Sequence, residues 1–142
     1  MRQGVTIILR REDGAILLQH RDADPSITNP DCWALLTGAV EPGEAVTDAA
    51  IRELKEETTY SVKSNDLHYI GRKPQLIGDE IVDRTIYLIF YDRRQLICRQ
   101  EGQAMIFAQP SAFPIMNILP EHLDFITQAE TMLQGAQRER RG

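Results

Sequence analysis

The chain has 142 residues, of which 42% are hydrophobic, and a formal net charge of −5 at pH 7. This length suits one domain with its own core, and the negative charge argues against a basic surface that binds nucleic-acid polymers. Two cysteines cannot build a disulfide framework, and the N-terminal apolar run is too short for a signal peptide or a membrane span. We therefore expect a cytoplasmic protein with a single domain over residues 1–135.

The N-terminal third predicts short β-strands. Residues 5–9 and 15–19 are β-rich runs, and the segment between them ends in Asp13-Gly14, a strong hairpin signal. A polar loop with two prolines covers residues 22–30. The apolar run over residues 33–36 then predicts one short strand.

A glycine-rich loop and a short helix follow, in the sequence GAVEPGEAVTDAAIRELKEETTY that begins at Gly38. At about 100° per residue, three carboxylates fall within one sector of this helix: Glu53, Glu56 and Glu57. An adjacent apolar sector can seat the helix on a core: Ala50, Ile51 and Leu54. Like charges three or four residues apart each cost a helix roughly 0.2–0.5 kcal/mol. A bound cation would turn this repulsion into binding energy, and Mg²⁺ or Mn²⁺ suits an all-oxygen site.

The same segment resembles the Nudix box, written G-x5-E-x7-R-E-U-x-E-E-x-G-U with U a bulky apolar residue. The matching residues, all in register, are Gly38, Glu44, Arg52, Glu53, Leu54, Glu56 and Glu57, with Tyr60 at the last position. One position departs, because Thr59 stands where the family has the glycine that closes the helix in a left-handed conformation.

This resemblance implies a Nudix fold, an α/β (α+β) domain built as an α/β/α sandwich around a central mixed β-sheet. It also implies that Glu53, Glu56 and Glu57 are ligands of Mg²⁺ or Mn²⁺, with the Gly38 carbonyl as an additional ligand. Glu53 and Glu56 are then catalytic as well as metal-binding. Arg52 is an orienting catalytic residue, because a guanidinium can fix carboxylates in a bidentate geometry.

The remaining chain predicts further strands and a C-terminal helix. Strands are expected over residues 67–70, with an extension to 76 left open, then over 84–91 and 105–107. Apolar residues recur at helical spacing from Pro120, which suits a first helical turn. We expect this helix to end at Gly135 and the charged residues 136–142 to form a disordered tail.

A fourth carboxylate outside the box is implied by the resemblance, and two glutamates compete for the role. Glu101, just before the predicted strand at 105–107, resembles the downstream glutamate that mutator-type triphosphatases of this family use as a metal ligand or catalytic base. Glu80 lies beside Gly78-Asp79, in a loop that we expect to be mobile. We favour Glu101.

The resemblance implies hydrolysis of a phosphoanhydride bond in a small nucleoside diphosphate-linked compound. We expect a nucleoside triphosphate, with oxidised purine nucleotides included. The alternatives are a nucleotide sugar, ADP-ribose or a pterin triphosphate, or a non-catalytic nucleotide-binding regulatory module on the same fold. Arg21 is a candidate phosphate contact. Asn117 resembles a position that reads a purine edge, and equally suits a turn cap. A homodimer is left open.

Overall fold

The computed structural model describes residues 2–27 and 29–141. The strands in these residues are β1 (Arg2–Arg10), β2 (Ile16–His20), β3 (Trp33–Ala34), β4 (Leu36–Ala39), β5 (His68–Ile77), β6 (Glu80–Phe90) and β7 (Ala104–Ala108). The α-helices are α1 (Val46–Thr58) and α2 (Pro120–Arg141), and two short 3₁₀ turns are η1 (Ser64–Asp66) and η2 (Pro110–Ile115). None of the helices in this part of the chain combines the length and the apolar character needed to cross a bilayer.

The strands of the described residues form one mixed sheet with the order β3-β2-β1-β6-β5, to which β4 adds beside β1 and β7 beside β2. The central pair, β1 and β6, is parallel, and Val5 lies opposite Thr85. All the other strand pairs are antiparallel. The prediction of a mixed sheet is therefore confirmed.

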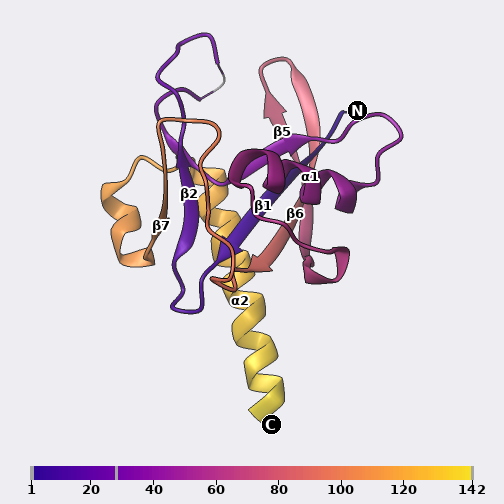
Figure 1. Cartoon of the computed structure of the whole chain (residues 1–142), viewed down its shortest axis with the longest axis vertical. Helices are drawn as coiled ribbons and strands as arrows, with labels where there is room; N and C mark the ends of the chain where they lie inside the picture. Colours follow the sequence, from indigo (N-terminus) through magenta and orange to yellow (C-terminus); the bar gives the residue numbers. More distant parts are fainter. Residues whose placement is uncertain (1, 28, 142) are drawn as a thin grey trace.

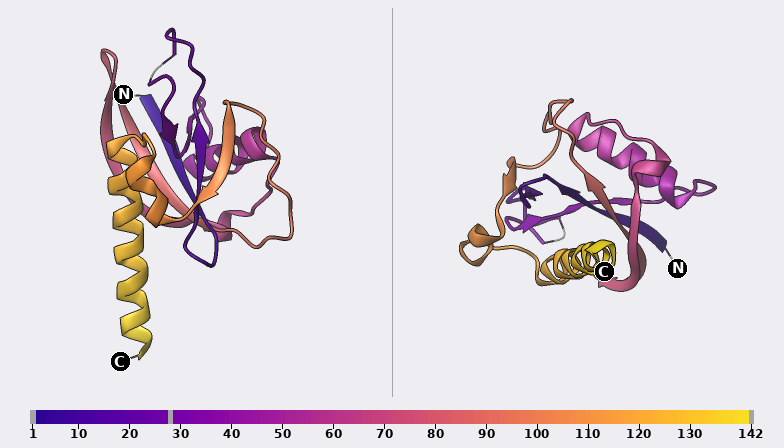
Figure 2. Two further views of the ribbon diagram at one scale, coloured as in Figure 1. Left: turned by 90° about the vertical axis from the view of Figure 1, so that its left-hand side faces the viewer. Right: turned by 90° about the horizontal axis from the view of Figure 1, so that it is seen from below.

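The sheet lies between the two helices, with α1 against one face and α2 against the other (Figures 1 and 2). Side chains along β1 alternate between these layers, as the pleat requires. Val5, Ile7 and Leu9 pack in the cluster that includes α1, whereas Ile8 packs in the cluster with α2. The chain thus has the predicted α/β/α architecture, and α2 extends well beyond the sheet (Figure 1).

The single strand expected over residues 33–36 is divided in two. β3 pairs with β2, whereas β4 pairs with β1, so the chain passes from one neighbour to the other at Leu35. The Leu35 N–H donates to Nδ1 of His122, 3.0 Å away, instead of joining a strand ladder. A buried donor must find an acceptor, and here a side chain from α2 supplies it.

Two further expectations are corrected. Glu80 is not in a mobile loop, because Gly78 and Asp79 form a two-residue turn and Glu80 is the first residue of β6, opposite Ile77. The C-terminal helix does not end at Gly135 but continues to Arg141. A single glycine costs a helix only about 1 kcal/mol relative to alanine, and the Gln, Arg and Glu residues after it favour helix. The expected disordered tail is helical over 136–141, and Gly142 lies outside the described residues. The boundary at residue 135 stays a prediction.

Candidate active site

Helix α1 presents its charged face beside the edge of the core. On its opposite face, the α1 residues Ala49, Ala50 and Leu54 are fully buried. Ile51, which was expected in the same apolar sector, is only half-buried. The helix ends at Thr59, which is left-handed (φ 65°) and whose N–H donates to the Lys55 carbonyl. A threonine therefore occupies a conformation that normally favours glycine.

Arg52 holds the loop and the helix together. Its guanidinium makes a bidentate contact with Glu44, at 2.8 and 3.0 Å, and also donates to the Ala39 carbonyl at 3.0 Å. The same group reaches Glu53 at 3.0 Å and Glu56 at 3.2 Å. Its hydrogen bonds lower the pKa of the Glu44 carboxyl to about 2. This geometry is that of an orienting residue.

Gly38 allows Glu53 to approach the strand. A Cβ atom at Gly38 would lie 2.1 Å from the Glu53 carboxyl carbon, so no larger residue fits without displacing that side chain. The pKa of Glu53 is raised, first by burial and then, against the influence of Arg52, by neighbouring carboxylates. The Gly38 carbonyl, predicted as a ligand, accepts a hydrogen bond from Arg84 at 3.2 Å.

Glu57 is a buried carboxylate without a full set of partners. It is 5% exposed, and within the described residues its Oε2 atom is buried with no hydrogen-bond partner. Burial raises the pKa of Glu57 to about 8, and the charges of Glu53, Glu101 and Glu56 add to the effect. An unpaired buried carboxylate of this kind is costly unless a cation or a proton compensates it.

Glu101 reaches the cluster through a loop that is docked on the end of α1. The backbone N–H groups of Cys98 and Gln100 donate to the carbonyls of Thr58 and Glu57, at 2.8 and 3.0 Å. These bonds satisfy carbonyls that the helix itself leaves unpaired. The Glu101 charge raises the pKa of both Glu53 and Glu57. Glu101 is therefore near enough to the box carboxylates for its charge to affect them.

The competing glutamate is engaged elsewhere. Glu80 forms an ion pair with Arg2 at 2.5 Å, and its charge is not among the causes of the Glu53 and Glu57 pKa shifts. Glu56 is near the cluster but more than half exposed, and it faces Arg52. In residues 2–27 and 29–141, no three metal-binding side chains are gathered at coordination spacing as they stand. Arg52 hydrogen-bonds both Glu53 and Glu56.

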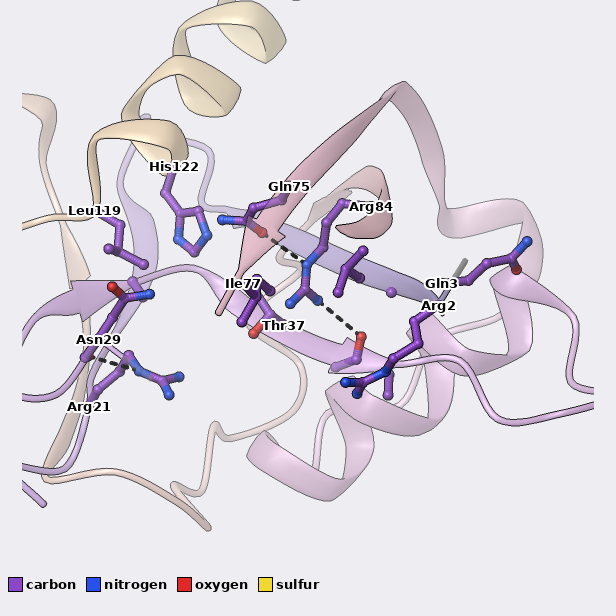
Figure 3. A pocket seen from close by; sticks show the side chains of 15 residues that line it. Arg2, Gln3, Arg21, Asn29, Thr37, Gln75, Ile77, Arg84, Leu119 and His122 are labelled. Atoms are coloured by element: carbon purple, nitrogen blue, oxygen red, sulfur yellow. Dashed lines mark hydrogen bonds between the residues drawn. The ribbon is translucent and has the colours of Figure 1, made fainter. Parts of the chain in front are cut away.

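Figure 3 shows a pocket of about 290 Å³, whose lining includes Gly38, the residue against which Glu53 packs. Its charged lining is basic: Arg2, Arg21 and Arg84. Arg84 donates to the Gln75 side chain and to backbone carbonyls, and no salt bridge links it to a carboxylate within the described residues. Its guanidinium is thus surrounded by neutral acceptors at the wall of an anion-sized space.

The pocket contains one predicted substrate residue and lacks the other. Arg21 lines it and donates to the Asn29 carbonyl at 3.2 Å. Asn117 is exposed and does not line the pocket, and its backbone carbonyl accepts the Trp33 N–H at 2.7 Å. Sequence reasoning missed Arg84 and His122. Arg84 carried a signal, because it shares the strand face of Ile86 at a spacing of two residues.

The family model described as NUDIX domain matches residues 1–104. The chain is 39% identical to dihydroneopterin triphosphate diphosphatase of Escherichia coli strain K12 over 66 residues, which cover 46% of this chain and 40% of that protein. It is 30% identical to nucleoside triphosphatase NudI of Salmonella arizonae over 139 residues, which cover 86% of this chain and 94% of that one.

The fold comparison agrees. The crystal structure of the MutT protein from Methanosarcina mazei Go1 aligns with a TM-score of 0.76 at 22% identity, over 92% of this chain and 94% of that one. At this identity the likeness concerns the fold alone.

Proposed function

The chain belongs to the Nudix hydrolase family, and from that premise we propose that it hydrolyses a phosphoanhydride bond in a nucleoside diphosphate-linked compound, with Mg²⁺ as cofactor and a nucleoside triphosphate as substrate. Oxidised purine nucleotides are included in this substrate class. Relatives in the family are named as diphosphatases and triphosphatases.

The observation that carries the proposal is the unpartnered carboxylate oxygen of Glu57, buried beside Glu53 and Glu101. Divalent cations are general in this family, and the oxygen-only donor set of the cluster fits a hard cation such as Mg²⁺. Glu53, Glu56 and Glu57 would hold the metal, together with Glu101 and the Gly38 carbonyl. When bound, Mg²⁺ would lower the pKa of a water and neutralise charge on the phosphates.

The protein side chains then divide the remaining work. Arg52 fixes Glu53 through one hydrogen bond and the Gly38–Ala39 strand end through another. In this proposal Glu101 is the general base that accepts the proton of the attacking water. Arg21 and Arg84 line the adjoining pocket, where their guanidinium groups can contact phosphate oxygens.

A pterin triphosphate is the second candidate, because the 39% identity to the dihydroneopterin triphosphate diphosphatase covers part of this chain. Both candidates place a triphosphate at the carboxylates and a heterocycle in the pocket. A regulatory module without turnover is less well supported, because a simple binding protein has no need to keep Glu53, Glu56 and Glu57 beside Glu101.

The test is a substrate screen with purified protein and Mg²⁺. The panel contains ordinary and oxidised nucleoside triphosphates, dihydroneopterin triphosphate, ADP-ribose and nucleotide sugars. Separate assays of phosphate and pyrophosphate release identify the bond that is cleaved. We expect pyrophosphate release from a triphosphate, its loss with EDTA and its recovery with Mg²⁺ or Mn²⁺. Turnover that persists in EDTA, or no turnover of any member, contradicts the proposal.

The net charge of −5 supports a small-molecule substrate rather than a nucleic-acid polymer. Light scattering coupled to gel filtration would show whether the protein is a monomer or a homodimer.

A further inference from the structure

His122 lies at the inner end of the pocket, and its surroundings fix the position of its proton. It is in the first turn of α2 and is 2% exposed. Its Nδ1 atom accepts the backbone N–H of Leu35 at 3.0 Å. An accepting nitrogen carries no proton, so a neutral imidazole in this setting has its proton on Nε2.

The ring is kept neutral and in place. Burial, followed by the positive charges of Arg84 and Arg21, lowers the pKa of His122 to about 4. The ring stacks on Phe125 with a centroid separation of 5.7 Å. A flip of the imidazole would leave the buried Leu35 N–H without its acceptor, which is unfavourable.

The Nε2–H group is open to the pocket. His122 is one of the residues that line this space and its side chain points into it (Figure 3). Within the described residues no acceptor pairs with Nε2. This atom is also not one of the side-chain nitrogens and oxygens that are fully buried without a hydrogen-bond partner. The pocket therefore contains a donor with a fixed direction and no protein acceptor.

The pocket wall around His122 is mixed. Ala34 and Leu119 are apolar, whereas Gln75, Arg21 and Asn29 also line this part of the pocket (Figure 3). At the other end Arg84 donates to the carbonyl of Gly38, the residue packed against Glu53. A substrate whose phosphates lie at the carboxylates would pass Gly38 and place its uncharged part near His122.

We propose that His122 is a specificity-determining residue, whose Nε2–H donates a hydrogen bond to an uncharged acceptor on the heterocyclic part of the substrate. The acceptor is a carbonyl oxygen or a ring nitrogen. This inference rests on the proposed function for the location of the phosphates. An anionic oxygen would instead favour the imidazolium form, because an adjacent negative charge stabilises the protonated ring.

The first test is NMR of ¹⁵N-histidine-labelled protein, with His68 as an internal reference because it is exposed on β5 and outside the pocket. The probes are the monophosphates of guanosine, adenosine, cytidine and uridine, with Mg²⁺ present. We expect His122 to be neutral and protonated on Nε2 at pH 7, and at least one probe to shift the Nε2–H resonance while the ring stays neutral. No turnover is needed, so this result is independent of whether hydrolysis is found.

Three results would overturn the proposal: protonation of His122 on binding, an unmoved Nε2–H resonance while other resonances respond, or no response to any probe.

The second test compares affinities. His122→Phe keeps a ring against Phe125 but removes the donor, and His68→Phe is the matched control. For a purine probe that binds, the comparison ligands are its 7-deaza form and the form without its exocyclic carbonyl or amine. Wild-type protein and His68→Phe should discriminate against one of these by about 3- to 10-fold, the usual value of one neutral hydrogen bond. His122→Phe should lose this discrimination. Equal discrimination by a folded His122→Phe protein would refute the proposal, and the NMR test decides the question if that variant does not fold.

Discussion

A glutamate lies near each end of α1, and the two carboxylates have opposite environments. At the N-terminal end, Glu44 has both carboxylate oxygens on Arg52, and its pKa is lowered to about 2. At the C-terminal end, Glu57 has an oxygen that no described residue contacts by a hydrogen bond, and its pKa is raised to about 8. A carboxylate whose partners are present serves to position its neighbours. A buried carboxylate without such partners can instead bind a ligand of opposite charge.

The sharpest way to break this contrast is to remove the unpaired charge. We expect Glu57→Gln to abolish Mg²⁺-dependent hydrolysis, a larger loss than the 10- to 100-fold typical when an outer partner of a metal ligand is removed. The matched control is Glu41→Gln, because Glu41 is exposed and its ion pair with Arg52 is long, at 4.0 Å. It should retain nearly full activity. Steady-state rates decide, and full turnover by Glu57→Gln with an unchanged Mg²⁺ requirement would refute its role as a ligand.

A second comparison extends the contrast to the distal carboxylate. Glu101→Gln should lower kcat by about 10²–10⁴-fold, the usual contribution of general acid–base catalysis. Glu80→Gln should have a far smaller effect, since that residue is paired with Arg2. Both are measured at saturating Mg²⁺. The opposite ranking would transfer the catalytic role to Glu80.

The contrast also predicts a pH dependence of stability in the metal-free protein. The pKa of Glu57 is about 8 when folded and near its ordinary value of 4.5 when unfolded, so the folded state binds more protons between these values. Stability should therefore fall as pH rises from about 4.5 to 8, by on the order of a few kcal/mol.

His122 acts in the opposite sense below pH 6.5, because its folded pKa is about 4. The free energy of unfolding is measured in urea at each pH for the wild type and for Glu57→Gln. Subtracting one from the other cancels the contribution of His122, which both proteins share. Parallel curves would mean that Glu57 titrates normally, and added Mg²⁺ should flatten the wild-type dependence.

The smallest expected effect lies just beyond Glu57. Thr59 is a β-branched residue at φ 65°, so Thr59→Gly should stabilise the protein by up to about 1 kcal/mol, net of the greater freedom of glycine in the unfolded chain. Urea denaturation is the measurement, and the active-site contrast should be unaffected. Destabilisation would show that the threonine side chain contributes more than its backbone strain costs.

Local pattern predicted much of this molecule. The box helix and the Asp13-Gly14 hairpin follow from spacing and turn chemistry within a few residues. Glu101 could be selected only through the family resemblance, because its position depends on a loop that crosses from Cys98 to the end of α1. No sequence rule states that two backbone N–H groups will find those two carbonyls.

Two of the missed residues depend on contacts between distant parts of the chain. His122 was one of three scattered histidines, and its proton position depends on Leu35, 87 residues earlier in the chain. Arg84 was visible as a charged residue on an apolar strand face, yet its neutral partners come from β1, β4 and β5. Gly135 was overvalued as a stop signal, because no positive φ is imposed there.

The docking of the loop after Cys98 has a consequence for how this enzyme can be altered. The bonds that hold it run between main-chain atoms of Cys98, Gln100 and the end of α1, and every residue type except proline can make them. A library randomised at the side chains of residues 98 and 100 should therefore retain many active members. Insertion of one residue between them would change the register of both bonds and displace Glu101. The loop is thus permissive in composition and strict in length, so its side chains can be varied while the position of Glu101 is kept.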